Sequence, residues 1–321
     1  MTLNDFYINT YNSLIRVINY TINSDKRIFW LYLVSSMLLA YYVYHKTKKK
    51  YSFLKYIFNK KVWLSQSSKV DYALIFINSF VKVFLLGSFV YYGLKLAYYT
   101  DEYLSHTLGL SDNNFSHFQI MFGFTITLTI LKDLGTYLTH LAQHKISFLW
   151  EFHKVHHSAT VLNPITQYRI HPVELIINNI TATLIFGITM GVFDYLSNHP
   201  IDELEFLGVN VFSFAFLFFG ANLRHSHVKL KYFNKLENIF ISPFQHQIHH
   251  SNNPIHFDKN LGAKLAIWDW MFGTLVKSES VATLKFGLGK NDDINYTTIF
   301  QNLYMPFLKV SQHLTKWFKN R

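Results

Sequence analysis

The 321-residue chain has no cysteine, and only 15% of its residues are charged. The absence of cysteine excludes disulfides, thiolate metal sites and cysteine nucleophiles. Soluble domains have about a quarter of charged residues, so the low charge and the 50% hydrophobic content predict a polytopic membrane protein. Acidic residues are also scarce: the net charge is +11. Because the lysines border apolar runs, this charge favours a membrane surface over nucleic acid as the partner.

Long apolar runs predict about four to five spanning or re-entrant helices. They lie within residues 28–44, 72–99, 115–131, 173–195 and 204–221, and the last two could instead form a re-entrant pair. Loops rich in lysine and arginine stay in the cytoplasm. The basic segments that follow the first, third and fifth runs are therefore expected on that side.

Histidine is over-abundant, with 17 copies; twelve lie in two blocks, residues 132–172 and 222–274, and ten of these twelve form closely spaced motifs. The first block has an i, i+4 pair and an i, i+3, i+4 triplet; the second has an H-x-H pair and repeats the triplet. The pair and triplet spacings place imidazoles on one face of a helix. The ten residues are His140, His144, His153, His156, His157, His225, His227, His246, His249 and His250.

Ten imidazoles are enough to hold two metal ions with open positions. Burying them without a metal would leave donors and acceptors unsatisfied. Neutral imidazole suits iron, zinc, copper and nickel, so the ligand type alone does not select the metal. At least one of His225 and His227 is expected to be a ligand. Asp133, on the helix face of His140, is expected to accept a hydrogen bond from the far nitrogen of a ligating histidine.

The pattern H-x3-H, H-x2-H-H, H-x2-H-H in an apolar chain resembles the sterol desaturase/fatty acid hydroxylase superfamily of integral-membrane diiron oxygenases. The resemblance includes "LWEFHKVHHSATVLNPITQYRIHPVE", "ISPFQHQIHHS" and "DKNLGAKLAIWDWMFGTLV", and it covers about residues 132–276. It implies that eight histidines are catalytic iron ligands, with a further ligand at His225. These eight are His140, His144, His153, His156, His157, His246, His249 and His250.

Other positions match the family without an assigned role. Family members often have asparagine where this chain has His227. His171 is expected either beside the metal ligands or facing substrate, or simply at a helix start. Asp258, Asn260 and Asp269 are expected mainly to pin the histidine-bearing helices, with hydrogen bonding to a ligand as the alternative, and Asp258 is the candidate for that contact.

The fold expected is all-α: a polytopic membrane helical bundle with a cytoplasmic histidine-rich helical cap that holds a dimetal site. Three regions are predicted. Residues 1–114 form an N-terminal membrane region with two spans and a basic cytoplasmic loop, and residues 115–276 form the catalytic region. Residues 277–321 form a basic amphipathic tail.

The resemblance implies an O2-dependent oxidoreductase with two non-haem irons that hydroxylates or desaturates a lipid: a sterol, a fatty acyl chain or an alkyl ether. Its electrons would come from an external cytochrome b5-like or ferredoxin-like protein. The expected location is the bacterial inner (plasma) membrane, or the endoplasmic reticulum in a eukaryote. The alternatives are a non-catalytic protein that binds metal or lipid, and a metal transporter, although a transporter would carry its histidines within the spans.

Overall fold

The computed structural model describes residues 3–197 and 199–319, and within those ranges the protein is predominantly helical. Its named strands, β1 (Glu205–Phe206) and β2 (Val209–Asn210), pair as one short antiparallel hairpin. The helical fold class predicted from the sequence is therefore confirmed.

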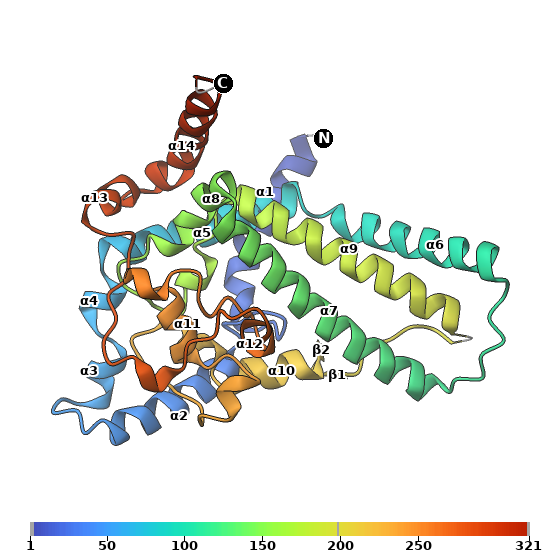
Figure 1. Ribbon diagram of the computed structural model, residues 1–321, viewed down its shortest axis with the longest axis horizontal. Coiled ribbons are helices and arrows are strands. Elements are labelled where there is room, and N and C mark those ends of the chain that lie inside the picture. The colour runs from blue at the N-terminus through green and yellow to red at the C-terminus, as the bar shows by residue number, and fades with distance from the viewer. Residues whose placement is uncertain (1–2, 198, 320–321) are drawn as a thin grey trace.

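Three long helices form an elongated layer: α6 (Phe89–Leu108), α7 (His117–Lys145) and α9 (Pro172–Leu196) (Figure 1). α6 and α9 approach closely through Gly187 and Gly191. A Cβ at Gly191 would clash with the carbonyl oxygen of Ala97, and one at Gly187 would lie 2.8 Å from the carbonyl oxygen of Gly93. Two glycines four residues apart allow such backbone proximity in membrane helices.

The remaining elements gather at one end of this layer, around the C-terminal end of α7, while the α6–α7 connection lies at the other end (Figure 1). The α-helices there are α1 (Leu3–Ile18), α2 (Trp30–Lys46), α3 (Phe53–Ile57), α4 (Lys60–Trp63), α5 (Gln66–Phe84), α8 (Ser147–His157), α10 (Val211–Phe218), α11 (Pro243–His249), α12 (Ile267–Met271), α13 (Lys290–Asp293) and α14 (Ile299–Lys319). The 3₁₀ helices are η1 (Asn19–Thr21), η2 (Thr166–Tyr168), η3 (Ala221–His225), η4 (Leu236–Asn238), η5 (Pro254–His256), η6 (Ser278–Ser280) and η7 (Ile294–Tyr296).

Fewer helices qualify as membrane spans than the sequence predicted. Among the described residues α9 is long and apolar enough, and the pair α5–α6, bent by 49°, would add one broken span. α2 has only 17 residues, and polar residues at both ends of the apolar part of α7 lower its hydropathy. The predicted crossing within 204–221 is wrong as a single span, because its helix α10 has eight residues. At 1.5 Å per residue that helix is about 12 Å long, whereas a bilayer core is about 30 Å thick. A polytopic bundle with cytoplasmic histidines stays a prediction.

Local capping sets where two of the histidine-bearing helices, α7 and α11, begin. Ser116 and Gln119 form a capping box at the start of α7, and Ser242 and Gln245 form another at the start of α11. In each, the serine hydroxyl accepts the backbone N–H three residues on, while the glutamine side chain accepts the N–H of the serine. The caps satisfy the free amide groups of the first turn and so fix the register of the histidines that follow.

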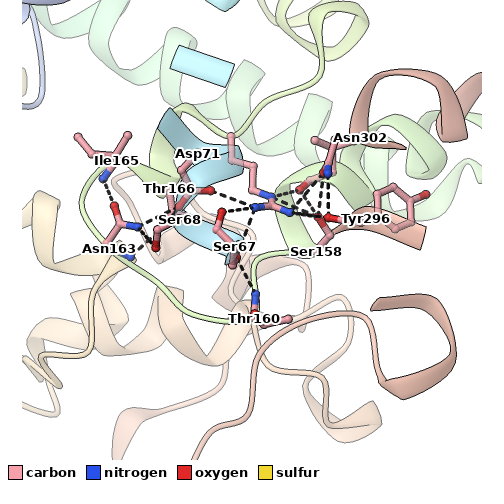
Figure 2. Close-up of polar contacts among 12 residues, drawn as sticks. Ser67, Ser68, Asp71, Ser158, Thr160, Asn163, Ile165, Thr166, Tyr296 and Asn302 are labelled. Carbon is pink, nitrogen blue, oxygen red and sulfur yellow. Dashed lines mark hydrogen bonds and ion pairs between the residues drawn. The ribbon is translucent and has the colours of Figure 1, made fainter. Parts of the chain in front are cut away.

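A buried polar network joins distant parts of the chain, and Figure 2 shows its members Asp71, Ser158 and Asn302. The Arg169 guanidinium, 1% exposed, lies 3.1 Å from the carboxylate of Asp71 on α5. It also donates to the hydroxyl of Ser158 after α8, at 2.7 Å, and to the side-chain oxygen of Asn302 on α14, at 3.3 Å. One side chain thus links the three regions predicted from the sequence.

Candidate metal centre

Nine histidines converge in two groups, and within each group the candidate ligand nitrogens lie within 4.8 Å of one another. The triplets do not form one group each. On α8, His153 and His157 join one group and His156 the other. All three lie on one face, but i+3 and i+4 flank i on its two sides, so the rings can point to two separate centres. The five-histidine group comprises His140, His144, His153, His157 and His249; the four-histidine group comprises His156, His225, His246 and His250.

Hydrogen bonds at the far side of the rings fix the tautomer of five of these imidazoles. In each, Nδ1 faces an oxygen of the backbone or of a carboxyl group, so Nδ1 carries the proton and Nε2 keeps its lone pair. The distances are 2.8 Å from His140 to Leu261 O, 3.2 Å from His144 to Asp258 Oδ1, 2.9 Å from His153 to Glu174 Oε1, 3.1 Å from His156 to Arg169 O, and 2.9 Å from His249 to Lys259 O.

The freed lone pairs then face one another. Nε2 of His140 and Nε2 of His153 are 3.1 Å apart, yet neither carries a proton, so they cannot hydrogen bond. Nε2 of His144 and Nε2 of His249 are buried and have no hydrogen-bond partner. Buried acceptors are costly when unsatisfied, and a cation satisfies all of them together. The residues therefore fit a metal ion.

The four-histidine group has similar contacts between Nε2 atoms, but it borders an arginine, and Nδ1 of His246 accepts a hydrogen bond rather than donating one. Nε2 of His225 lies 3.0 Å from Nε2 of His250, 3.1 Å from that of His246 and 3.3 Å from that of His156. The Arg224 guanidinium donates to Nδ1 of His246, at 2.8 Å, and to the carbonyl of Ala263. Sequence reasoning missed Arg224, although it directly precedes His225 in the "RHSHV" motif.

Burial keeps these imidazoles neutral. Desolvation lowers the pKa of all nine, and for His156 burial, with nearby Arg169, Arg27 and Arg224, lowers the pKa to about 3. A neutral imidazole is the form that ligates metal. At neutral pH the two groups thus offer uncharged nitrogen donors.

Asp258 makes the contact expected of it, and Asp133 does not. The hydrogen bond from His144, followed by that from Lys145, lowers the pKa of Asp258 to about 2, so its carboxylate is charged. The Asp133 carboxylate instead accepts the backbone N–H groups of Lys264 and Leu265 and the indole N–H of Trp268. Asp133 lies about two helical turns below His140, which places it beside the 264–268 turn rather than beside the rings.

Asp269 and Asn260 pin the backbone around the histidines, as favoured from the sequence. Asp269 accepts the N–H groups of Leu261 and Gly262, at 2.8 Å each. This holds the Leu261 carbonyl to which His140 donates. Asn260 donates from its side chain to the carbonyls of Gln245 and Val276. Both residues therefore act through the backbone and touch no imidazole of the two groups.

The structure places His227 and His171 outside both groups. η3 ends at His225 and the chain is extended at Ser226, so His227 leaves the cluster and packs edge-on against Tyr56, with ring centroids 4.9 Å apart. The prediction of His227 as a metal-site residue is not supported by this position. His171 caps α9 by accepting the Val173 N–H, and its other nitrogen faces Leu303 O at 3.1 Å, which is the helix-start role.

Glu174 is the second residue that sequence reasoning missed. It lies in the first turn of α9, is 4% exposed, and accepts the Nδ1–H of His153. The other carboxyl oxygen is buried without a partner. The sequence feature that could have predicted this contact is the position of Glu174 in "RIHPVE". There the start of α9 places a carboxyl group near the first histidine triplet.

Two cavities reach the histidines. One, of about 350 Å³, touches both groups, through His140 and His153 on one side and His156, His225 and His246 on the other. The second, of about 380 Å³, borders the five-histidine group at His144, His157 and His249, beside Trp150. Both cavities therefore leave space for another molecule beside the histidines.

Comparison with known proteins identifies the part of the chain that carries this centre. Residues 125–274 match the fatty acid hydroxylase family. An alkylglycerol monooxygenase of Caenorhabditis elegans is 28% identical over 55% of this chain and 30% of its own length, and one of Danio rerio is 31% identical over 44% and 28%. The ornithine lipid hydroxylase OlsE of Rhizobium tropici is 30% identical over 49% of this chain and 41% of its own.

The chain thus spans less than half the length of these relatives, and no solved structure matches it. The matched residues carry all nine histidines of the two groups. The resemblance seen in the histidine pattern is confirmed: residues 125–274, just under half of the chain, match the fatty acid hydroxylase family, and these relatives are members of the sterol desaturase/fatty acid hydroxylase superfamily.

Proposed function

We propose that this protein is a membrane-bound lipid hydroxylase that uses O2, two non-haem irons and an external reductant. One observation carries the proposal: nine imidazoles converge on two points, and in five of them a fixed Nδ1–H group turns the free Nε2 atom inward. The family match supports iron as the metal, since the donor set by itself suits several metals.

The relatives support a lipid substrate and oxygen insertion. One is named for alkylglycerols and a monooxygenase reaction, another for ornithine lipids and hydroxylation. Both names describe the addition of oxygen, so hydroxylation is proposed here over desaturation. The sterol, fatty acyl and alkyl-ether classes all remain within the proposal.

When bound, the irons would supply the O2 chemistry that an unactivated C–H bond requires. The chain supplies geometry and environment. Asp258 and Glu174 hold the rings of His144 and His153, while backbone carbonyls hold three others. Such contacts orient ligands and strengthen their basicity. The cavity that touches both groups is where a lipid carbon would be positioned.

The proposed setting is a membrane with the histidines on the cytoplasmic side. α9 supplies the span, and the lysine-rich residues 46–61 lie at the same end of the molecule as the histidine-bearing helices (Figure 1). Basic loops favour the cytoplasm. A cytochrome b5-like or ferredoxin-like donor would reach the centre from that side, since the chain has no cysteine for a cluster of its own.

The test is to purify the protein in detergent, measure its metals, and follow lipids by mass spectrometry with and without O2 and reductant. We expect iron near two per chain, one per histidine group, and a product with one added oxygen. His156→Ala and His249→Ala, one from each group, should abolish turnover, whereas His45→Ala, at an exposed position on α2, should not. Zinc without O2 consumption, or full activity in either group variant, would refute the proposal; loss of two hydrogens would replace hydroxylation with desaturation.

A further inference from the structure

The cavity that touches both histidine groups is lined by an excess of cations. Four basic side chains border it, Lys26, Arg27, Lys82 and Arg224, against two carboxyl groups, those of Asp25 and Glu174. The bases come from the loop before α2, from α5 and from η3. Residues far apart in sequence thus bring like charges to one space.

The two carboxyl groups do not neutralise this set. Asp25 is paired only with Lys26, at 3.6 Å, and its side chain is 58% exposed, while Glu174 accepts the Nδ1–H of His153. Arg27 and Lys82 form no ion pair with any described residue. The ammonium groups of Lys26 and Lys82 lie 6.0 and 5.8 Å from the same Tyr20 ring centroid, so both lysines border one aromatic ring.

Arg27 is the base best placed for a ligand. It retains more than a third of its accessible surface, yet protein surrounds it closely enough that burial lowers its pKa. Both facts fit a side chain that projects into an enclosed, solvated space. Its main-chain carbonyl accepts from the Asn222 amide, which fixes the backbone and leaves the guanidinium free.

Confined like charges are unfavourable without a counter-ion, and metal ions in the histidine groups would add positive charge. Arg224 already donates to His246 and Ala263. Arg27 and Lys82 are therefore the available donors, together with Lys26, whose one ion-pair partner among the described residues is the exposed Asp25. The cavity, about 350 Å³, falls within the size range of small-molecule sites. It is lined by residues of α5, α7 and α9. α9 is the candidate membrane span and α5 belongs to the bent pair α5–α6, which favours a lipid as the bearer of the anion.

We infer that Lys26, Arg27 and Lys82 bind the anionic headgroup of the substrate lipid, a phosphate or carboxylate, beside the histidines. This inference rests on the proposed function and names its substrate class. Arginine offers a planar fork for two oxygens of such a group, and lysine a point charge. With the headgroup held in the same cavity as the histidines, the oxidised carbon lies near the headgroup rather than at the far end of the acyl chain.

The test compares two amphiphiles with the same acyl chain, a lysophosphatidate and a neutral monoacylglycerol. Each is titrated by calorimetry into the purified protein in uncharged detergent. We expect the phosphate to bind about tenfold tighter or more, a ratio typical of charge-assisted contacts. Arg27→Gln/Lys82→Gln should remove that ratio. Lys82→Arg should keep it, and so should Lys60→Gln/Lys61→Gln, which removes the same charge from α4, away from the cavity.

Equal binding of both amphiphiles, or an unchanged ratio in Arg27→Gln/Lys82→Gln, would overturn the inference. Inorganic phosphate is the third ligand; if it competes as well as the lysolipid, the site binds free anions and the lipid assignment fails. Binding is measured without turnover, which separates this inference from the proposed function. If lysophosphatidate bound tightly but was not oxidised, the proposed function alone would be contradicted. If lipids were oxidised but binding showed no preference for the charged headgroup, this inference alone would be contradicted.

Discussion

Replacing Arg169 by methionine tests whether the buried network holds the molecule together. Methionine approximates the length of the arginine stem but removes every polar contact. The lost partners include the Asp71 carboxylate, the Ser158 hydroxyl and the backbone carbonyls of Val155 and Ser67, at 2.7–3.1 Å. Asp71 would keep its bonds from Thr166 and Asn163, but its charge would be buried without a cation.

The expected cost follows from the burial of this pair, since Arg169 is 1% and Asp71 0% exposed. Removing one partner of a buried ion pair costs about 3–5 kcal/mol. An unfolding entropy of about 2.1 cal/mol/K per residue gives about 0.7 kcal/mol/K for 321 residues. The melting temperature should therefore fall by about 4–7 °C.

The assay is thermal unfolding of the purified protein, with bound iron measured alongside. Because the Arg169 carbonyl accepts the Nδ1–H of His156, loosening this segment should also lower the metal content of the four-histidine group. Asp71→Asn/Arg169→Met should be less destabilised than the sum of its single variants, since neither charge is left unpaired. A single variant Arg169→Met that melts within about 1 °C of the wild type would refute the reasoning.

Three further outcomes are expected. His225→Ala should lose metal from the four-histidine group while His227→Asn keeps it, as metal analysis would show; equal losses would restore His227 to the site. Gly191→Leu should destabilise the protein by about 1–3 kcal/mol by overpacking the α6–α9 contact. Gly87→Ala is the control, because its added Cβ meets only an ordinary contact at 3.4 Å. Identical melting temperatures of the two variants would contradict the close packing of α6 on α9. The histidines of both groups have lowered pKa values in the folded protein. Their contribution to stability is therefore full above the unfolded pKa of about 6.5 and is lost as the pH falls toward the folded pKa, which is about 3 for His156. Melting temperatures that did not decline between pH 7.5 and pH 5 would exclude this linkage.

Much of the candidate site was predictable because helix periodicity is local. The spacing within "FHKVHHS" and "QHQIHHS" places three imidazoles on each helix face, and the structure brings both sets together. The spacing did not show that each triplet divides between two groups, because that depends on how α8 and α11 face each other. The membrane spans were less predictable: hydropathy alone did not reveal that residues 204–221 are broken into a hairpin and a short helix.

Carboxylates were the least predictable part of the site. Asp133 and Glu174 are both buried acids near the histidines in sequence, yet Asp133 caps a distant turn while Glu174 holds His153. A carboxylate accepts equally from a backbone N–H or an imidazole. Its partner is therefore chosen by which surface packs against its helix, and sequence spacing carries no information about that.

By itself the sequence determined the helical class, the histidine pattern and the resemblance to the fatty acid hydroxylase family, because composition and i, i+3, i+4 spacing act within one segment. Tertiary structure alone decided the grouping of the imidazoles, the exclusion of His227 and the basic cavity around Arg27. These depend on contacts between segments more than a hundred residues apart, such as Arg27 with the cavity beside His140. Such contacts arise from packing, which no local pattern encodes.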